Sequence, residues 1–349
     1  MTGTVSRPLS RSLSRSLRRR RVAAPLGIAL AGALLLAGCA EPEARGAGDK
    51  EALKPVSLSV AEDGSPEVTV DGAIETEEIS SRVLKDGEGE EIEPGDVAMV
   101  QTAVVDPETG EVTADNFTQG SEAVHLTDSL KEANDVLYNM LDQNKVGAQV
   151  AFFMPASQLG EGAGDQLMVF QIAGATEARA TGEPVQDVDP ALPEVTRDEE
   201  SGEPTIATPE GDAPQDLVVQ PLLQGDGPEV GSGDYVTLQY RGVKWSDGEE
   251  FDSTWSKGTL FGTTLNQVVE GWAQGLEGQK VGSQVMLVIP PELGYGSSEG
   301  HELQDETMVF VVDIIHAMPP AQLPEADAES AEPSEADTES AEPSESAAE

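Results

Sequence analysis

This sequence has very little cysteine, histidine or positive charge, and few aromatic residues. A single cysteine among 349 residues excludes a disulfide within the chain, so each folded domain must be stabilised by its own hydrophobic core. Three scattered histidines do not suggest a metal site, and no phosphate-binding or nucleophilic motif is present, so we expect neither a metal nor a cofactor. The formal net charge of −45 argues against nucleic acid or anionic lipid as a direct partner of the folded part.

The first 38 residues have the layout of an export signal. Seven arginines without any acidic residue precede the apolar run VAAPLGIALAGALLLAG (22–38). The run leads into LAGC (36–39), which resembles the lipobox of bacterial lipoproteins, in which the cysteine is lipid-modified and begins the mature chain. We therefore predict a signal peptide over 1–38 and lipidation of Cys39. The alternative is a membrane-spanning helix, for which about 17 residues with an internal proline are marginal.

The other end, residues 321–349, is a low-complexity tail. EADAESAEPS (325–334) is followed by EADTESAEPS (335–344), a repeat of acidic residues, Ser, Ala and Pro. Such a segment buries too little apolar surface to offset the entropy of ordering the chain, so we predict that it is disordered. It is either a spacer or cation-binding brush, or a solvated tail with no specific role.

The interior contains one pattern twice. KVGAQV (145–150) returns as KVGSQV (280–285), and GDVAMVQ (95–101) returns as GDYVTLQ (233–239). MVF, at 168–170 and 308–310, recurs as well. The offsets of 135, 138 and 140 residues are nearly constant, which indicates one fold present in two copies.

These repeats place the two domains at 56–178 and 213–320. Residues 39–55 are predicted to be an anchor region with a linker. Residues 179–212 are rich in Pro and acidic residues and show no periodicity, so they are predicted to be a disordered linker between the domains.

Each domain is predicted to have an α+β fold in which an antiparallel sheet packs on one short helix. In YVTLQY (235–240), apolar and polar residues alternate, as in a strand with one buried face. In TLNQVVEGWAQGL (264–276), apolar residues recur at helical spacing, which predicts a helix with an apolar stripe against the sheet. DSLKEANDVLYNML (128–141) is the matching helix of the first domain.

The second domain contains a series of short motifs in a fixed order: Tyr-x-Gly (240–242), Phe-Asp-Ser (251–253), Val-x-Gly-Trp (269–272), Val-Gly (281–282), Ile-Pro (289–290), Tyr-Gly (295–296) and Val-Phe (309–310). In this order and spacing, residues 215–318 resemble the FKBP-type peptidyl-prolyl isomerase domain along its whole length. The first domain is similar to a divergent member of the same family. The whole layout resembles tandem-domain bacterial isomerase lipoproteins anchored at the cell surface.

The resemblance implies an apolar pocket lined by aromatic side chains in the second domain. It assigns the walls to Tyr240, Phe251, Phe261, Trp272 and Phe310, with the Trp272 indole as the floor beneath the proline ring. Aromatic residues on strands are more often core than site. However, all three Trp and three of the four Tyr of the chain lie in this domain, which favours the pocket.

Polar groups are expected at the rim of this pocket. The resemblance places Val268 and Val269 on the helix beside it, with the Val269 N–H and the Tyr295 hydroxyl donating to substrate carbonyls. Asp252 is expected to hold a tyrosine hydroxyl. Because Phe251 and Asp252 are consecutive, a bend or bulge is needed to aim both at the pocket.

The loop 297–307 departs from the family pattern. Leu303 is the candidate there for the apolar substrate contact. His301 in the same loop is interpreted as a solvated residue, with a pH-sensitive contact as the alternative. This departure bears on peptide preference and on the affinity for macrolide inhibitors more than on activity.

The first domain is predicted to have lost the site. Matched by sequence, the residues that replace Tyr240, Phe251, Asp252, Trp272 and Tyr295 are Thr102, Thr113, Ala114, Leu137 and, approximately, Glu161. Phe310 is matched with Phe170. Polar side chains in the pocket would admit water, so we expect a retained fold without catalysis, serving as a spacer or as a clamp for unfolded chains.

The resemblance thus implies an exported prolyl isomerase, lipid-anchored through Cys39 at the outer face of the cell membrane. Its partners would be proline-containing unfolded or nascent secreted polypeptides, with macrolide inhibitors as further ligands. One alternative is a binding module, a holdase that captures proline-containing segments without catalysis. Another is a structural surface lipoprotein, which would predict decay of the site in both domains rather than in the first alone.

Overall fold

Two antiparallel sheets with the same strand order form the framework of the chain. The computed structural model describes residues 45–159 and 164–319, so the predicted signal peptide, Cys39 and the acidic tail lie outside the described residues. Along the sheets the order is β3-β7-β8-β4-β5 in the first domain and β12-β16-β17-β13-β14 in the second. An extra strand pairs with the same member of each sheet, β6 with β4 and β15 with β13.

The first domain consists of β1 (Val56–Val60), β2 (Pro66–Val70), β3 (Ser80–Lys85), β4 (Asp96–Val105), β5 (Val112–Asp115), β6 (Glu122–His125), α1 (Asp128–Ala133), α2 (Asp135–Asp142), β7 (Gln149–Met154), α3 (Ala156–Leu159) and β8 (Gln166–Glu177).

The second domain begins with β9 (Glu183–Pro184), β10 (Val195–Arg197), β11 (Pro204–Ile206) and β12 (Val218–Gln224). It continues with β13 (Tyr235–Lys244), β14 (Glu250–Ser253), α4 (Thr254–Lys257), β15 (Phe261–Thr264), η1 (Leu265–Gln267), α5 (Glu270–Leu276), β16 (Gln284–Ile289), η2 (Pro291–Leu293) and β17 (Met308–Met318). Together with the strand order, this confirms the predicted α+β class and shows two domains with the same sheet topology.

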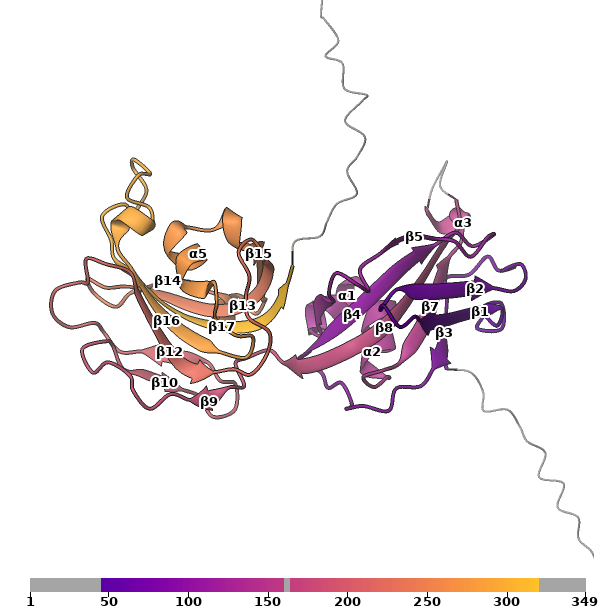
Figure 1. Ribbon diagram of the computed structural model, residues 1–349, viewed down its shortest axis with the longest axis horizontal. Coiled ribbons are helices and arrows are strands. Elements are labelled where there is room, and N and C mark those ends of the chain that lie inside the picture. Colours follow the sequence, from indigo (N-terminus) through magenta and orange to yellow (C-terminus); the bar gives the residue numbers. More distant parts are fainter. Residues whose placement is uncertain (1–44, 160–163, 320–349) are drawn as a thin grey trace, which may run out of the picture. The chain divides into compact units, whose positions relative to one another are not determined.

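The central strands of the second sheet are buried on both faces. Along β16, Val285, Leu287 and Ile289 pack in a core under α5, whereas Met286 and Val288 pack in a separate core on the outer face. Alternate residues of a strand point to opposite faces, so a continuous apolar run needs a cover on each side. Figure 1 shows α5 and β10 on opposite sides of this sheet.

The cover of the outer face comes from the segment that was expected to be unstructured. The prediction of a disordered linker over 179–212 is wrong: β10 and β11 pair as a hairpin, and β9 extends the sheet beside β12. Ile206 of this hairpin, 9% exposed, belongs to the outer core together with Trp245 and Val243. Most acidic residues of this segment are exposed, but Pro193, Pro204 and Pro209 are buried together with Ile206. A high content of proline and acidic residues therefore did not show that part of the segment is packed.

Hydrogen bonds fix this segment along its length. The Ala180 N–H donates to Asp313 Oδ2 (2.8 Å), and the Trp245 indole N–H donates to the Gly211 carbonyl (3.2 Å). Asp313 is 2% exposed, and its burial raises the pKa of this carboxyl to about 6 against the opposing effect of the Ala180 and Gln284 hydrogen bonds.

The first domain is built in the same way. The hairpin β1–β2 covers the outer face of its sheet, where Leu58 and Val68 lie over Phe153 and Val169. Residues 45–55, which fall within the predicted anchor and linker region, take part in this cover: Leu53 is fully buried, and backbone hydrogen bonds join Ala47 to Ser81 on β3.

Both predicted helices are interrupted. Val268 and Val269, placed on the helix by the resemblance, have extended backbones between η1 and α5, and Val269 is the N-cap residue of α5. The matching helix of the first domain breaks at Asn134, whose side chain accepts a hydrogen bond from the Leu137 N–H and so starts α2. The predicted apolar spacing is present in both segments, but neither is one continuous helix. In the second domain the β-branched residues Val268 and Val269 lie at the break, and in the first domain the capping side chain of Asn134 does.

Replacing Ile206 with Asp tests whether the segment 178–212 is packed in solution. A buried, unpaired carboxylate is expected to cost roughly 2 kcal/mol or more of the free energy of unfolding and to release the hairpin. Trypsin should then cleave rapidly after Arg197 of the variant and slowly in the wild-type chain.

The matched control is Thr205→Asp, which introduces the same charge one residue earlier at an exposed position. Its cleavage rate and melting temperature should stay close to wild type. Rapid cleavage after Arg197 in the wild-type chain itself would contradict the packed hairpin.

Candidate active site

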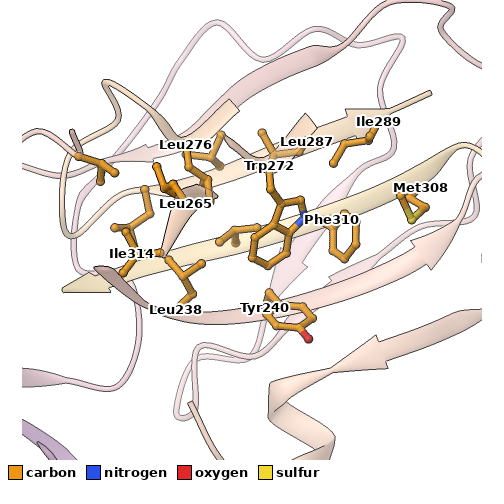
Figure 2. Packing of buried hydrophobic residues seen from close by; sticks show 14 of the residues in the cluster. Leu238, Tyr240, Leu265, Trp272, Leu276, Leu287, Ile289, Met308, Phe310 and Ile314 are labelled. Carbon is orange, nitrogen blue, oxygen red and sulfur yellow. The ribbon is translucent and has the colours of Figure 1, made fainter. Parts of the chain in front are cut away.

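Five aromatic rings from five different elements meet under the N-terminus of α5. Trp272 of α5 has its ring centre 5.1 Å from that of Tyr240 on β13 and 5.1 Å from that of Phe310 on β17, nearly perpendicular to both. Phe261 of β15 lies 5.7 Å from Tyr240, and Phe251 of β14 lies 5.3 Å from Phe310. Figure 2 shows the Trp272 indole beside the rings of Phe310 and Tyr240. Such edge-to-face contacts fix ring orientation as well as burying apolar area.

The cluster has a buried floor and a partly open rim. Trp272, Tyr240 and Phe310 are 4%, 6% and 6% exposed, whereas Phe251 and Phe261 are half-buried. The Trp272 indole N–H is buried and finds no acceptor among the described residues. The structure thus brings together the five aromatic residues that the resemblance assigned to one pocket.

A β-bulge aims Phe251 and Asp252 at the same place. In the pairing of β13 with β14, Gly242 lies opposite Asp252 and Val243 opposite Glu250, so Phe251 is the extra residue. This confirms the predicted bulge. Gly242 is required below it, because a Cβ there would lie 2.7 Å from the Phe310 ring and 2.8 Å from the Phe251 ring.

Asp252 joins the rim to the buried floor. Its Oδ2 accepts a hydrogen bond of 2.7 Å from the Tyr240 hydroxyl, and its Oδ1 accepts one from the Lys257 ammonium group. Burial tends to raise the pKa of Asp252, but the hydrogen bonds from Lys257 and Tyr240 outweigh it and lower the pKa below the usual 3.8. Burial, followed by the bond to Asp252, raises the pKa of the Tyr240 hydroxyl, which therefore stays protonated.

Lys257 was not among the predicted site residues. It lies at the end of the short helix α4, which the Ser253 side chain caps by accepting from the Ser256 N–H. The available sequence indication was a basic residue five positions after Asp252, with no other between Lys244 and Lys280.

Two hydrogen-bond donors at the rim remain available for a ligand. Neither the Val269 N–H nor the Tyr295 hydroxyl donates to another group within the described residues. Both residues are partly buried against the aromatic cluster. An apolar ring could therefore sit on the cluster while carbonyl groups on either side of it meet these donors.

The loop after Tyr295 packs back onto the site. The His301 ring stacks on the Tyr295 ring with centres 4.0 Å apart and planes 8° from parallel, and His301 Nδ1 accepts a hydrogen bond from the Leu303 N–H (3.1 Å). Leu303 is only 3% exposed and belongs to the core that contains the pocket aromatics. The structure thus places Leu303 in the wall behind the cluster, and His301 is a contact of Tyr295 that the sequence interpretation missed.

Comparison with known proteins identifies the family. The model of the FKBP-type peptidyl-prolyl cis-trans isomerase family matches residues 227–315. A Corynebacterium glutamicum protein named "Probable FK506-binding protein" is 44% identical over 115 residues, which are 33% of this chain and 98% of that protein. The chain belongs to the FKBP-type peptidyl-prolyl isomerase family.

Two further FKBP-type proteins show the same likeness. The "FK506-binding protein" of Streptomyces anulatus is 40% identical over 117 residues, 32% of this chain and 94% of that protein. The crystal structure of FkpA from Escherichia coli is similar over 30% of this chain and 48% of that chain, with 35% identity and a TM-score of 0.28. The enzyme class is therefore peptidyl-prolyl cis-trans isomerase of the FKBP type.

The first FKBP-like domain has a different set of side chains at the corresponding positions. Strand pairing places Thr102 at the position of Tyr240, Thr113 at that of Phe251 and Ala114 at that of Asp252, as the sequence match has them. The counterpart of Tyr295, about Glu161, lies outside the described residues.

One sequence match in this domain is wrong. Phe152 pairs with Met168, and the equivalent pair in the second domain is Leu287 with Phe310, so Met168 occupies the position of Phe310. Phe170 corresponds to Val312. The shared MVF motif had suggested an alignment that is displaced by two residues. Because side chains alternate between the two faces of a strand, a shift of two residues leaves each one on the same face. The apolar–polar pattern therefore could not reveal the error.

Replacing Asp252 with Asn should lower kcat/KM for a proline-containing tetrapeptide about 10-fold, because the Tyr240 hydroxyl and Lys257 lose their anionic acceptor. Since the pKa of Asp252 is lowered, wild-type activity should be independent of this group from pH 8 down to pH 5 and should fall only below the usual value of 3.8. A protease-coupled isomerisation assay at several pH values measures both effects.

Asp226→Asn makes the same chemical change at an exposed site in the loop after β12 and serves as the control. It should leave kcat/KM unchanged. Equal activity of Asp252→Asn and wild type would remove Asp252 from the site.

Proposed function

We propose that the second domain isomerises X–Pro bonds of unfolded polypeptides on the aromatic cluster around Trp272. The observation that carries this proposal is the combination of a buried aromatic floor with two unused donors, the Val269 N–H and the Tyr295 hydroxyl, at its rim. The family match over 227–315 supports the same reaction.

The mechanism needs neither a nucleophile nor a metal. An X–Pro bond crosses a barrier of roughly 18–20 kcal/mol because twisting it removes amide resonance. The planar amide is more dipolar than the twisted one, so an apolar site that excludes water disfavours the planar form more than the transition state. Catalysis then follows from binding the twisted bond better than the planar bond.

Each residue has a definite part in this scheme. The Trp272 indole supports the proline ring, and Tyr240, Phe251, Phe261 and Phe310 exclude water around it. The Val269 N–H and the Tyr295 hydroxyl hold the carbonyls that flank the bond, so that only the X–Pro bond rotates. Asp252 keeps the Tyr240 hydroxyl and the Phe251 edge of the pocket in place. Val268 and Leu303 complete the apolar wall.

The first domain, in this proposal, keeps the fold without the activity. Thr102, Thr113 and Ala114 supply neither aromatic walls nor an anionic acceptor, and Leu137 replaces the indole floor. This domain would hold the active one away from its anchor or retain segments of unfolded clients.

Location and further ligands also belong to the proposal. The basic leader and LAGC (36–39) support export and lipid anchoring through Cys39, with the protein at the outer face of the membrane. No helix in the described ranges is long and apolar enough to cross a membrane. Because two relatives are named for binding FK506, macrolides of that type are candidate inhibitors of the second domain.

The deciding experiment compares Trp272→Leu with wild type in the full chain, since Leu is the residue at this position in the first domain. Loss of the indole floor should reduce kcat/KM for a series of Xaa-Pro tetrapeptides by roughly 10-fold or more, equivalent to about 1.4 kcal/mol of transition-state binding. Circular dichroism checks that the variant is folded.

Thr113→Ala in the first domain is the control and should have no effect, because its side chain is exposed. A wild-type chain that binds these peptides without accelerating isomerisation would point to a holdase instead. Full activity in a folded Trp272→Leu chain would place the activity outside this cluster.

A further inference from the structure

Arg241 bridges the hairpin β10–β11 and the strand that carries Phe251 and Asp252. It follows Tyr240 on β13 and points to the outer face of the sheet, with 18% of its side chain exposed. Its guanidinium group donates to the Pro204 carbonyl and, at 2.5 Å, to Glu203 Oε1, both on the hairpin segment. On the other side its Nε lies 2.7 Å from Glu250 Oε2, in an ion pair whose angle does not meet hydrogen-bond geometry.

Strand β14 has little else to hold it. It is an edge strand of four residues, β13 is its one partner among the described strands, and the bulge at Phe251 interrupts that pairing. Short edge strands with an interrupted ladder open easily. Yet Phe251 and Asp252 must keep a fixed place relative to Tyr240, and Glu250 is the residue directly before them.

The hairpin β10–β11 can support β14 because further contacts, independent of Arg241, attach it to the second domain. Ile206 packs with Trp245 in the outer core, and Thr208 lies against Gly248 in the turn between β13 and β14. A Cβ at Gly248 would lie 2.9 Å from the Thr208 hydroxyl oxygen, so turn and hairpin are in direct contact. Glu203, which directly precedes β11, therefore belongs to a segment that is held in place by its own packing.

The first domain provides an internal comparison. By strand pairing, Ala103 occupies the position of Arg241, and Val112 that of Glu250. There β2 contacts β5, and Val112, Val68 and Val70 all pack against the same apolar core. The ionic bridge is thus absent from the domain that also lacks the aromatic pocket and its carboxylate.

We propose that Arg241 is a positioning residue for the isomerase site: it ties β14 to the hairpin β10–β11 and so holds Phe251 and Asp252 at the pocket. The active unit accordingly includes the segment 178–212. This inference rests on the proposed function of the second domain. Arg241 acts through Glu250 and Glu203 and does not itself touch the substrate.

The test uses the full chain and two readouts, peptide isomerisation and amide hydrogen exchange of β14. Arg241→Met removes the bridge but leaves two carboxylates unpaired and lowers stability. A triple variant, Arg241→Met with Glu203→Gln and Glu250→Gln, removes all three charges and keeps the side-chain shapes. In the folded triple variant we expect kcat/KM to fall about 10-fold, chiefly through kcat, and the amides of 250–253 to exchange about 10-fold faster while those of 284–289 do not change.

Two comparisons separate positioning from stability. Lys244→Met breaks the Lys244–Glu249 pair (2.7 Å), which links β13 to the turn before β14 without touching the hairpin, and it should leave both readouts unchanged. Arg241→Lys keeps the charge but not the fork of donors, and it should recover activity only in part.

Each result decides the proposal. Unchanged exchange of 250–253 in the triple variant overturns the bridge as a support of β14. Faster exchange with wild-type kcat/KM overturns the positioning role. If the wild-type chain itself has no isomerase activity, the proposed function fails, and with it the catalytic part of this inference, while the exchange rates still decide whether Arg241 holds β14.

Discussion

Burial of the central strands on both faces is the constraint on which the rest of this structure depends. Every residue of β16 is buried, and α5 can cover only one side of the sheet. The second side is covered by β10–β11, which brings Glu203 and Pro204 to Arg241. The same packing that stabilises the domain therefore reaches the strand that carries the site. A polar, proline-rich segment can do this because few apolar residues suffice to anchor it.

On the inner face, apolar packing forms the floor of the site and one carboxylate, that of Asp252, orders its rim. The edge-to-face rings around Trp272 form a buried apolar floor, which is what the proposed reaction without covalent chemistry needs. A charge beside such a floor is costly unless it is paired. Asp252 meets this requirement through Lys257 and Tyr240, so the rim keeps its shape while the floor stays apolar.

The two FKBP-like domains show which features of the fold are separable from the site. Strand order, the two-sided core and the covering hairpin are present in both. Tyr240, Phe251 and Asp252 are replaced in the first domain, and so are Arg241 and Glu250, which contribute nothing to the apolar core. The residues around the site thus vary as a group, independently of those that specify the fold.

The sequence by itself determined the α+β class, the two domains and the aromatic residues of the pocket, because these follow from alternation, repeated motifs and the order of FKBP-type motifs. It also required a bend or bulge at Phe251 and Asp252, since consecutive side chains cannot otherwise share a face. Only the tertiary structure decided that 179–212 covers the outer face of the sheet and that the backbone at Val269 is extended. It also decided that Met168, and not Phe170 as the MVF motif suggested, occupies the position of Phe310. The reason is physical: local periodicity shows which face of a strand is apolar, but the segment that covers it and the register across it are set by contacts between residues far apart in the chain.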